Sequence, residues 1–353
     1  MKILYGVPGE GMGHATRSKV VIDYLISKGH EVKIVASDRA YQFLDKSFPG
    51  CAIEIKGFHF AYKNAEVSKS GTFMLILKSA AKNLAFNKTQ KQLLEHNFKP
   101  DLVISDFESF SFVFAKLHKL PIISIDNMQV MDRCKLDIKI AIAERNNYLL
   151  AKGIVKFKVP RCHHYFITSF FDADIKKTNT TLVPPIIRKE IQTAKVVRGK
   201  HIIMYQTSST LKTVKETLHQ FPQEKFLVYG MNKDEQDKNI TFKPFSETGF
   251  IQDLASAKAV IANGGFSFIS EAVYLKKPVY SFPINKQFEQ WMNAAYIEKL
   301  GYGKHCNSLN SDDLKVFLES IDAYERNLKQ YKQDGNYVLF EALESFVEKI
   351  KVV

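Results

Sequence analysis

A histidine and two carboxylates stand directly after two apolar runs of the chain. His14 follows KILYGV and the turn PGEGMG, and Asp106 and Glu108 follow DLVIS. A histidine oriented by a carboxylate is a good general base near neutral pH. We therefore expect His14 to take a proton from a substrate hydroxyl, with Asp106 or Glu108 as its partner. The alternative is that His14 only caps the helix that begins at this turn.

The glycines of this turn are similar to a dinucleotide-binding fingerprint but do not match it. GxGxxG needs its third glycine at the position that His14 occupies. A Gly-rich turn before a helix still presents backbone N–H groups and the positive end of the helix dipole. Gly11 and Gly13 are therefore candidates for binding an anionic ligand.

A second glycine turn, Gly264-Gly265, stands between the apolar run AVIA and a helical pattern that contains Glu271. Two glycines allow backbone N–H groups to approach a diphosphate at the start of a helix, so no metal is obligatory there. A carboxylate on the same helix can accept hydrogen bonds from both hydroxyls of a ribose. The pattern indicates a nucleoside diphosphate site.

Strand and helix patterns alternate along the chain and would position these side chains. Short apolar runs such as EVKIVAS and PIISIDN are separated by segments with apolar residues at helical spacing. This alternation predicts a parallel sheet with helices on both faces, where ligands bind at the carboxyl ends of the strands. Because His14 and Asp106 both follow strands, we expect them to face the same crevice.

The alternation stops once, at LVPPIIRKEI, where Pro184-Pro185 excludes a helix, and resumes with HIIMYQ. A chain of 353 residues is long enough for two ordinary domains. We therefore predict an α/β protein with two Rossmann-like, doubly wound domains facing a cleft. The expected parts are an N-terminal acceptor-binding domain at 1–183, a linker at 184–199, a C-terminal donor-binding domain at 200–310, and terminal helices at 311–353, the last of which could cross back to the first domain.

Positive charge is concentrated in the first half of the chain. Lys and Arg number 50 against 37 Asp and Glu, and residues 1–188 hold 28 and 17 of them, a net charge of +11 out of +13. Such an excess attracts an acidic substrate or an anionic membrane, or is a solvated surface without a partner. No nucleic-acid motif accompanies it, and we expect no nucleic-acid partner.

Apolar runs and cysteines constrain the location. No apolar run approaches the ~18 to 20 residues of a membrane span. The four cysteines are dispersed without a CxxC pair, which indicates neither a zinc site nor a disulfide framework. We expect a cytoplasmic protein.

The segment ANGGFSFISEAVYLKKPVYSFPINKQFEQWMNAAYIEKLGYG, at 262–303, resembles the donor-binding block of GT-B glycosyltransferases. The loop GMGHATRS is similar to the Gly-rich loop of the MurG-like enzymes of glycosyltransferase family 28. The resemblance spans most of the chain, and it implies a uridine diphosphate sugar as donor, with no cofactor and no obligatory metal. The donor-binding residues indicated by the local patterns and by the resemblance are Gly11, Gly13, Thr207, Ser208, Phe250, Ile251, Gly264, Gly265, Phe266, Ser267, Glu271, Glu289, Gln290 and Asn293.

The expected reaction is sugar transfer to an acceptor hydroxyl with inversion at the anomeric carbon. The basic N-terminal half favours a lipid-linked or cell-surface glycan as acceptor, with peripheral contact to an anionic membrane. One alternative is a non-hydrolysing nucleotide-sugar epimerase, which has the same architecture but needs further carboxylates in the cleft. The other is a catalytically silent protein that binds sugar nucleotides or glycans, which would keep Glu271 without needing His14.

Overall fold

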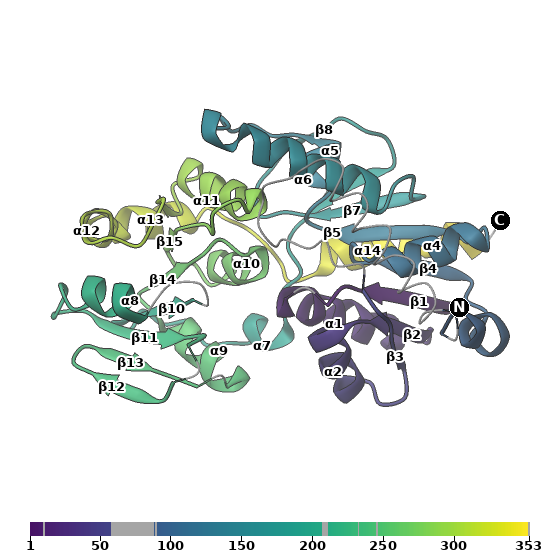
Figure 1. The fold of residues 1–353 in the computed structure, drawn as a ribbon, viewed down its shortest axis with the longest axis horizontal. Coiled ribbons are helices and arrows are strands. Elements are labelled where there is room, and N and C mark those ends of the chain that lie inside the picture. Colours follow the sequence, from purple (N-terminus) through teal and green to yellow (C-terminus); the bar gives the residue numbers. More distant parts are fainter. Residues whose placement is uncertain are drawn as a thin grey trace. The chain divides into compact units, whose positions relative to one another are not determined.

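The chain forms two compact units in a computed structural model (Figure 1). The model describes residues 1–9, 11–57, 88, 90–206, 211–231, 233–244 and 246–351. The first unit comprises 1–136, 149–186 and 336–353, and the second comprises 137–148 and 187–335. Each unit is built around its own sheet, so the prediction of two parallel-sheet α/β domains is confirmed.

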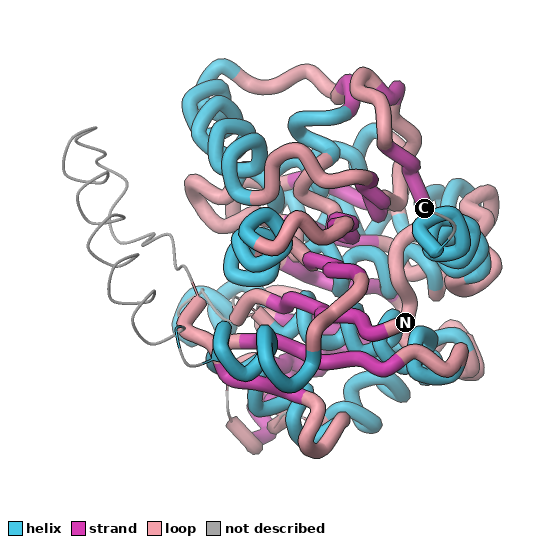
Figure 2. Tube along the Cα trace, turned by 90° about the vertical axis from the view of Figure 1, so that its right-hand side faces the viewer, coloured by secondary structure: helices cyan, strands magenta, loops and turns pink. Residues whose placement is uncertain are grey.

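The first sheet has the strand order β3-β2-β1-β4-β5-β7-β9, and all of its neighbouring strands run parallel. Its central strands are short runs of Val, Ile and Leu with buried side chains, as expected where helices cover both faces. Figure 2 shows these strands with helices on either side. The strands are β1 Lys2–Val7, β2 Glu31–Ala36, β3 Ala52–Glu54, β4 Leu102–Ser105, β5 Ile122–Asp126, β7 His164–Thr168 and β9 Thr180–Val183, and β6 Cys134–Lys135 pairs separately with β8 Asp174–Ile175.

The helices of the first unit follow its strands, as the alternating pattern predicts. They are α1 Met12–Ser27, α2 Asp38–Ser47, the π-helical turn η1 Leu94–Phe98, α4 Ser109–Leu117, α5 Val130–Arg133, α6 Arg145–Lys158, whose first turn lies in the second unit, and α14 Tyr337–Lys351. In the sequence, residues from Phe73 to about Asn97 follow an amphipathic pattern, and this segment lies largely outside the described residues.

The C-terminal helix α14 packs on the first sheet, although residues of the second unit precede it in sequence (Figure 1). Leu339, Leu343 and Val347 are buried in the same apolar cluster as β1, β2 and α1. The ring of Phe340 stacks on Tyr24 of α1 with centroids 3.8 Å apart. The first unit therefore needs both ends of the chain for its core.

The second sheet has the order β12-β13-β11-β10-β14-β15-β16, with parallel neighbours except for the antiparallel pair of β12 and β13. The strands are β10 His201–Tyr205, β11 Lys225–Tyr229, β12 Glu235–Asp237, β13 Ile240–Phe242, β14 Ala259–Ala262, β15 Val279–Ser281 and β16 Gly303–His305. The helical segments are the turn η2 Ile142–Glu144, then α7 Lys189–Gln192, α8 Leu211–Leu218, α9 Glu247–Ser256, α10 Phe266–Tyr274, α11 Phe288–Lys299, α12 Ser311–Glu319 and α13 Ile321–Leu328.

Two features of this unit differ from the sequence pattern. The apolar pattern of the sequence predicts a helix that begins near Phe250, but α9 begins at Glu247, because Ser246 is its N-cap and accepts a hydrogen bond from the N–H of Gly249 at 3.2 Å. Residues 137–148 belong to this unit although the first unit surrounds them in sequence. They contact α11, where the N–H of Asp137 donates to the hydroxyl of Tyr296 at 2.9 Å.

Candidate functional site

His14 lies in the first turn of α1, directly after the loop that leaves β1. The N-cap of this helix is Gly11, whose φ of 80° falls in the left-handed region that favours glycine. Gly13 is the second residue of the helix. Because Gly11 has no side chain with which to cap α1, and His14 turns its imidazole to Asp106, the interpretation of His14 as a capping residue is wrong.

Asp106 is the centre of a buried polar network at the end of β4. Its Oδ1 lies 3.0 Å from Nδ1 of His14, and its Oδ2 accepts a hydrogen bond from the hydroxyl of Ser18 at 3.0 Å. Arg17 donates to both oxygens, from Nη2 to Oδ1 at 2.5 Å and from Nε to Oδ2 at 2.8 Å. Nη1 of Arg17 donates to Oδ1 of Asn127 at 2.7 Å, which ties the network to the residue after β5.

The electrostatics of this network fix Asp106 as a carboxylate. Burial alone would raise its pKa, but the charge of Arg17 and the hydrogen bonds from Arg17 and His14 outweigh burial and hold the pKa of Asp106 well below its usual range. Asp106 is 1% exposed, whereas the side chain of His14 is 20% exposed. His14 is therefore the member of the pair that a substrate can reach.

Glu108, the other carboxylate expected near His14, has a different set of contacts. It is the N-cap of α4, and its two oxygens accept hydrogen bonds from the N–H groups of Phe110 and Ser111, each at 2.7 Å. Burial raises the pKa of Glu108, and these hydrogen bonds oppose that shift. The structure thus pairs His14 with Asp106 and gives Glu108 a capping role.

In the second unit, Gly264 allows the loop after β14 to approach α11 closely. Its φ is 104°, and a Cβ there would lie 2.7 Å from the carbonyl oxygen of Gln290. Nδ2 of Asn293 donates to the carbonyl oxygen of Gly264 at 3.0 Å. Asn293 is completely buried, and no described residue pairs with its Oδ1. In this state Asn293 therefore holds the glycine loop.

The start of α10 is open where a diphosphate is expected. Gly265 is the exposed N-cap, and a Cβ there would meet no described atom within 4 Å. Of the next two residues, Phe266 is buried and Ser267 is half-buried. The N–H groups of this first turn are the anion-binding feature that the sequence pattern predicts.

Glu271, the candidate ribose-binding residue, forms a bidentate ion pair with Arg188. Nε of Arg188 lies 2.6 Å from Oε1 and Nη2 lies 2.8 Å from Oε2. Nη1 of the same guanidinium donates to Glu247 at 3.0 Å. Each carboxylate oxygen of Glu271 thus accepts one hydrogen bond from Arg188 and keeps a further lone pair for another donor.

The first turn of α11 carries two further donor-site candidates, both half-buried. Glu289 is the second residue of the helix. Gln290 accepts a hydrogen bond at Oε1 from the N–H of Ile284 at 3.0 Å and donates from Nε2 to Gln287 at 2.8 Å. These contacts fix the orientation of the Gln290 amide at the base of the loop after β15.

Phe250 and Ile251 are buried on α9. The Phe250 ring lies in an aromatic cluster with Tyr205, Tyr229 and Phe268, at centroid distances of 5.9, 5.1 and 5.5 Å. The side chain of Phe250 is therefore part of the core. Only its backbone could contact the nucleobase of the donor. Thr207 and Ser208 lie outside the described residues.

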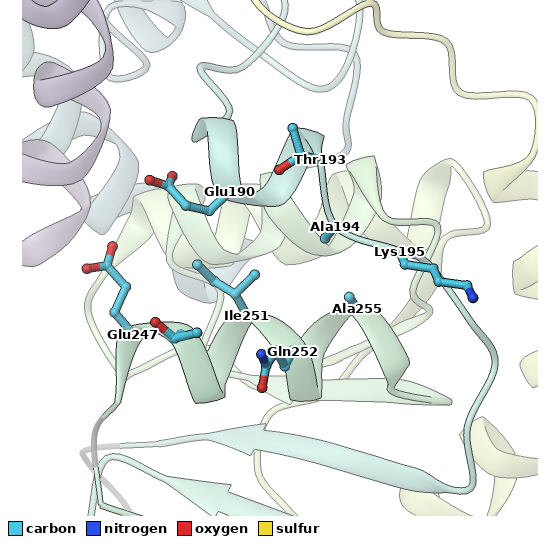
Figure 3. Close-up of a pocket in the computed structure, with 9 residues that line it drawn as sticks. Glu190, Thr193, Ala194, Lys195, Glu247, Ile251, Gln252 and Ala255 are labelled. Carbon is cyan, nitrogen blue, oxygen red and sulfur yellow. The ribbon is translucent and has the colours of Figure 1, made fainter.

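A pocket of about 470 Å³ lies between α7 and α9 (Figure 3). The carboxylates of Glu190 and Glu247 stand at one end of it and Lys195 at the other. Among the described donor-site candidates, only Ile251 lines this pocket. Two carboxylates repel a diphosphate, so the hollow is not the centre of the candidate site.

Sequence reasoning missed the two arginines that organise these sites. Arg17 stands one helical turn after His14, and this i, i+3 spacing is a signal that could have identified it. Arg188 lies 83 residues before Glu271, and no local sequence pattern predicts that the two residues pair. Asn127 and Ser18 were likewise not expected.

No group of three or more His, Cys, Asp or Glu among the described residues is arranged to hold a metal ion. None of the described helices is both long and apolar enough to cross a bilayer.

Comparison with known proteins identifies the family. The model described as glycosyl transferase family 1 matches residues 1–322. An uncharacterized glycosyltransferase of Methanosarcina acetivorans is 25% identical over 402 residues, covering 99% of each chain. A UDP-N-acetylglucosamine--N-acetylmuramyl-(pentapeptide) pyrophosphoryl-undecaprenol N-acetylglucosamine transferase of Bacillus cereus is 22% identical over 185 residues, which cover 46% of this chain and 52% of the relative.

Solved structures agree on the fold. The calicheamicin glycosyltransferase CalG4 superposes with a TM-score of 0.68 at 15% identity, covering 98% of each chain. UGT2 of Phytolacca americana, solved with UDP-2-fluoroglucose and pterostilbene, has a TM-score of 0.68 at 13% identity and covers 100% of this chain and 99% of its own. With a family match over most of its length and the GT-B fold of these neighbours, the chain belongs to glycosyl transferase family 1 and is a glycosyltransferase.

Proposed function

We propose that this glycosyltransferase transfers a sugar from a uridine diphosphate sugar to an acceptor hydroxyl, with inversion at the anomeric carbon and with His14 as the general base. The observation that carries the proposal is the pairing of the reachable imidazole of His14 with the buried carboxylate of Asp106 at 3.0 Å. A base fixed in this way can take the acceptor proton as the oxygen attacks. A single displacement at the anomeric carbon inverts its configuration.

The donor is assigned to the second unit. The open start of α10 would hold the diphosphate through backbone N–H groups, and the spare lone pairs of Glu271 would accept the ribose hydroxyls. The same N–H groups would stabilise the departing diphosphate, so we propose transfer without a metal ion. UDP as the nucleotide is supported by the names of the Bacillus cereus relative and the Phytolacca americana structure. A spinosyn rhamnosyltransferase of the same fold was solved with thymidine diphosphate, which makes that nucleotide the comparison to test.

The acceptor is proposed to be lipid-linked and the enzyme to be peripheral on an anionic membrane. Helix α6 supports this, because its sequence RNNYLLAKGIVKFK contains four basic residues, of which Lys158 is buried, and no acidic one. Leu149, Leu150 and Phe157 of this helix are exposed, Phe157 by 76%. An exposed apolar face with cations is typical of interfacial helices. The name of the Bacillus cereus relative, an enzyme acting on a pyrophosphoryl-undecaprenol acceptor, agrees with this proposal and with the MurG-like resemblance.

The test is to incubate the purified enzyme with isotope-labelled UDP and dTDP sugars, with and without a polyprenyl diphosphate-linked sugar, in the presence of EDTA. Transfer from a UDP sugar with inverted configuration, read by NMR of the product, is the expected result. Epimerisation of the donor without an acceptor would identify an epimerase, and binding without turnover would identify a silent binding protein. Loss of transfer in EDTA that returns with a divalent cation would contradict metal independence.

A further inference from the structure

Two basic side chains compete for one buried carboxylate in the first unit. Nδ1 of His14 lies 3.0 Å from Oδ1 of Asp106, and Nη2 of Arg17 lies 2.5 Å from the same oxygen. Asp106 is 1% exposed, and burying a charged carboxylate costs free energy unless a positive charge compensates it. Which of the two side chains supplies that charge decides the resting state of His14.

The contacts favour Arg17 as the source of the charge. A guanidinium is always protonated, and its planar fork matches a carboxylate when two hydrogen bonds form side by side. Arg17 forms both bonds to Asp106 and is fixed from its other side by Asn127. His14 makes a single contact with the carboxylate.

A second positive charge on His14 would be opposed in this arrangement. Nη2 of Arg17 lies 2.8 Å from Nδ1 of His14, close enough for direct repulsion if the imidazole were also charged. The ion pair of Arg17 with Asp106 has no net charge, so the carboxylate no longer draws a proton onto the imidazole. A general base has to be unprotonated before the reaction begins.

We propose that Arg17 is a positioning residue that keeps the imidazole of His14 neutral by supplying the positive charge that buried Asp106 requires. The inference rests on the proposed role of His14 as the general base. It adds the interaction that keeps the imidazole unprotonated before the reaction. Arg17 acts through Asp106 and His14 and needs no contact with either substrate.

Two further titratable groups near this network, Asp126 and Tyr5, have pKa values raised by burial. Asp126 at the end of β5 has a pKa raised by burial, although hydrogen bonds from Ser124 and Gln129 oppose the shift. Tyr5 of β1 has a pKa raised beyond its usual range, chiefly by burial. Both shifts favour the uncharged form, and the groups joined by direct contacts are Arg17, His14 and Asp106.

The test measures the charge of His14 directly. Protein carrying ¹³C- and ¹⁵N-labelled histidine gives one set of ring signals for each of the ten histidines, and the set missing from His14→Ala identifies His14. In Arg17→Gln, Asp106 loses its permanent cation and should draw a proton onto His14. We expect the titration of His14 to move to higher pH by about one unit or more, the scale of an opposite charge within hydrogen-bonding distance.

Three variants separate this electrostatic role from a structural one. Arg17→Lys keeps the charge, so its His14 titration should stay near that of the parent even if transfer slows. Arg17→Gln combined with Asp106→Asn removes both charges and should reverse the shift. Asp106→Asn alone leaves Arg17 beside the imidazole and should move the titration to lower pH, which keeps the proposal testable if Arg17→Gln does not fold.

Transfer rates supply the second readout. In Arg17→Gln, transfer should fall at least tenfold on the acidic side of neutrality and recover as the pH rises, in step with the NMR titration. If His14 in Arg17→Gln or Asp106→Asn titrates as in the parent, Arg17 has a structural role only and the proposal is wrong. If the titration moves as expected but His14→Ala still transfers sugar at the parental rate, the charge balance is established and the assignment of the base fails instead.

Discussion

Arg188 binds both carboxylate oxygens of Glu271, with Nε and Nη2 2.6 and 2.8 Å from Oε1 and Oε2. This arrangement orients the carboxylate before any ligand arrives, because a bidentate pair fixes the plane of both groups. It also compensates a negative charge on the helix whose start is proposed to bind a diphosphate.

The first prediction is that Glu271→Ala weakens binding of the UDP sugar by about 1.5 to 3 kcal/mol, the scale of hydrogen bonds to a charged group. Isothermal titration calorimetry gives the value. Glu247→Ala is the matched control, because Glu247 contacts the same guanidinium through Nη1 but is half-exposed. Equal losses in both variants would mean that Arg188 acts on the donor and that Glu271 does not bind the ribose.

The second prediction concerns the base. His14→Ala should lower the rate of transfer by about 10² to 10⁴-fold, the range that general-base catalysis supplies, while donor affinity changes little. His30→Ala is the control, since His30 is also half-buried in the first unit but contacts the N-terminus. A His14 variant that melts early and yet transfers at the parental rate would remove His14 from the mechanism.

The third prediction separates the two carboxylates near β4. Glu108→Ala removes the N-cap of α4 and should cost about 0.5 to 2 kcal/mol in the free energy of unfolding, measured by urea titration, with turnover of the folded enzyme retained. Asp106→Asn should reduce turnover, because His14 loses its charged partner. The assignment is wrong if Glu108→Ala loses turnover while unfolding at the parental urea concentration.

The fourth prediction concerns the glycine loop of the second unit. Gly264→Ala places a Cβ 2.7 Å from the carbonyl oxygen of Gln290 at a φ that strains any other residue, so the loop has to move. We expect weaker donor binding by calorimetry and a lower melting temperature. Gly50→Ala serves as the control, because Gly50 has a similar left-handed φ of 73°, has open space around its Cβ and is not a donor-site candidate. Parental affinity in Gly264→Ala would show that the loop geometry does not matter for the donor.

The fifth prediction concerns α6 and the membrane. The protein should sediment with vesicles that contain phosphatidylglycerol and not with neutral vesicles, and binding should weaken with salt, since exposed charges are screened over about 8 to 10 Å at physiological ionic strength. Phe157→Ser should reduce binding. Leu117→Ser, on α4 and 60% exposed, is the control. If vesicle binding does not change with salt, or is the same in Phe157→Ser as in the parent, α6 is not the membrane-binding surface.

The alternation of strands and helices could be predicted from the sequence. Buried parallel strands are short apolar runs rich in Val and Ile, and such runs are recognisable in the local sequence. The sequence also placed His14 and Asp106 after strands of one sheet, and the sheet order sets β1 beside β4. The choice between Asp106 and Glu108 was not available from sequence. Glu is not among the preferred N-cap residues, so the capping role of Glu108 carried no signature.

Contacts between residues that are distant in sequence could not be predicted from the sequence either. The pairing of Arg188 with Glu271 depends on how the segment after Pro185 lies against α10, and no periodicity encodes that. The placement of 137–148 with the second unit likewise depends on tertiary contacts of Asp137 with α11. The sequence indicated Asn293 only as a donor-binding residue, and the role of its buried amide in holding Gly264 depends on tertiary packing.

The packing of α14 on the first sheet sets an order for folding during synthesis. The ribosome makes β1 to β9 early, but Leu339, Leu343 and Val347 complete their core only after α14 emerges. All seven strands of the second sheet, from β10 to β16, are available before that point. Domains commonly fold from the N-terminus onward during translation, and we expect this chain to reverse that order. A C-terminal truncation at residue 335 would therefore damage the unit that carries His14, at the opposite end of the chain.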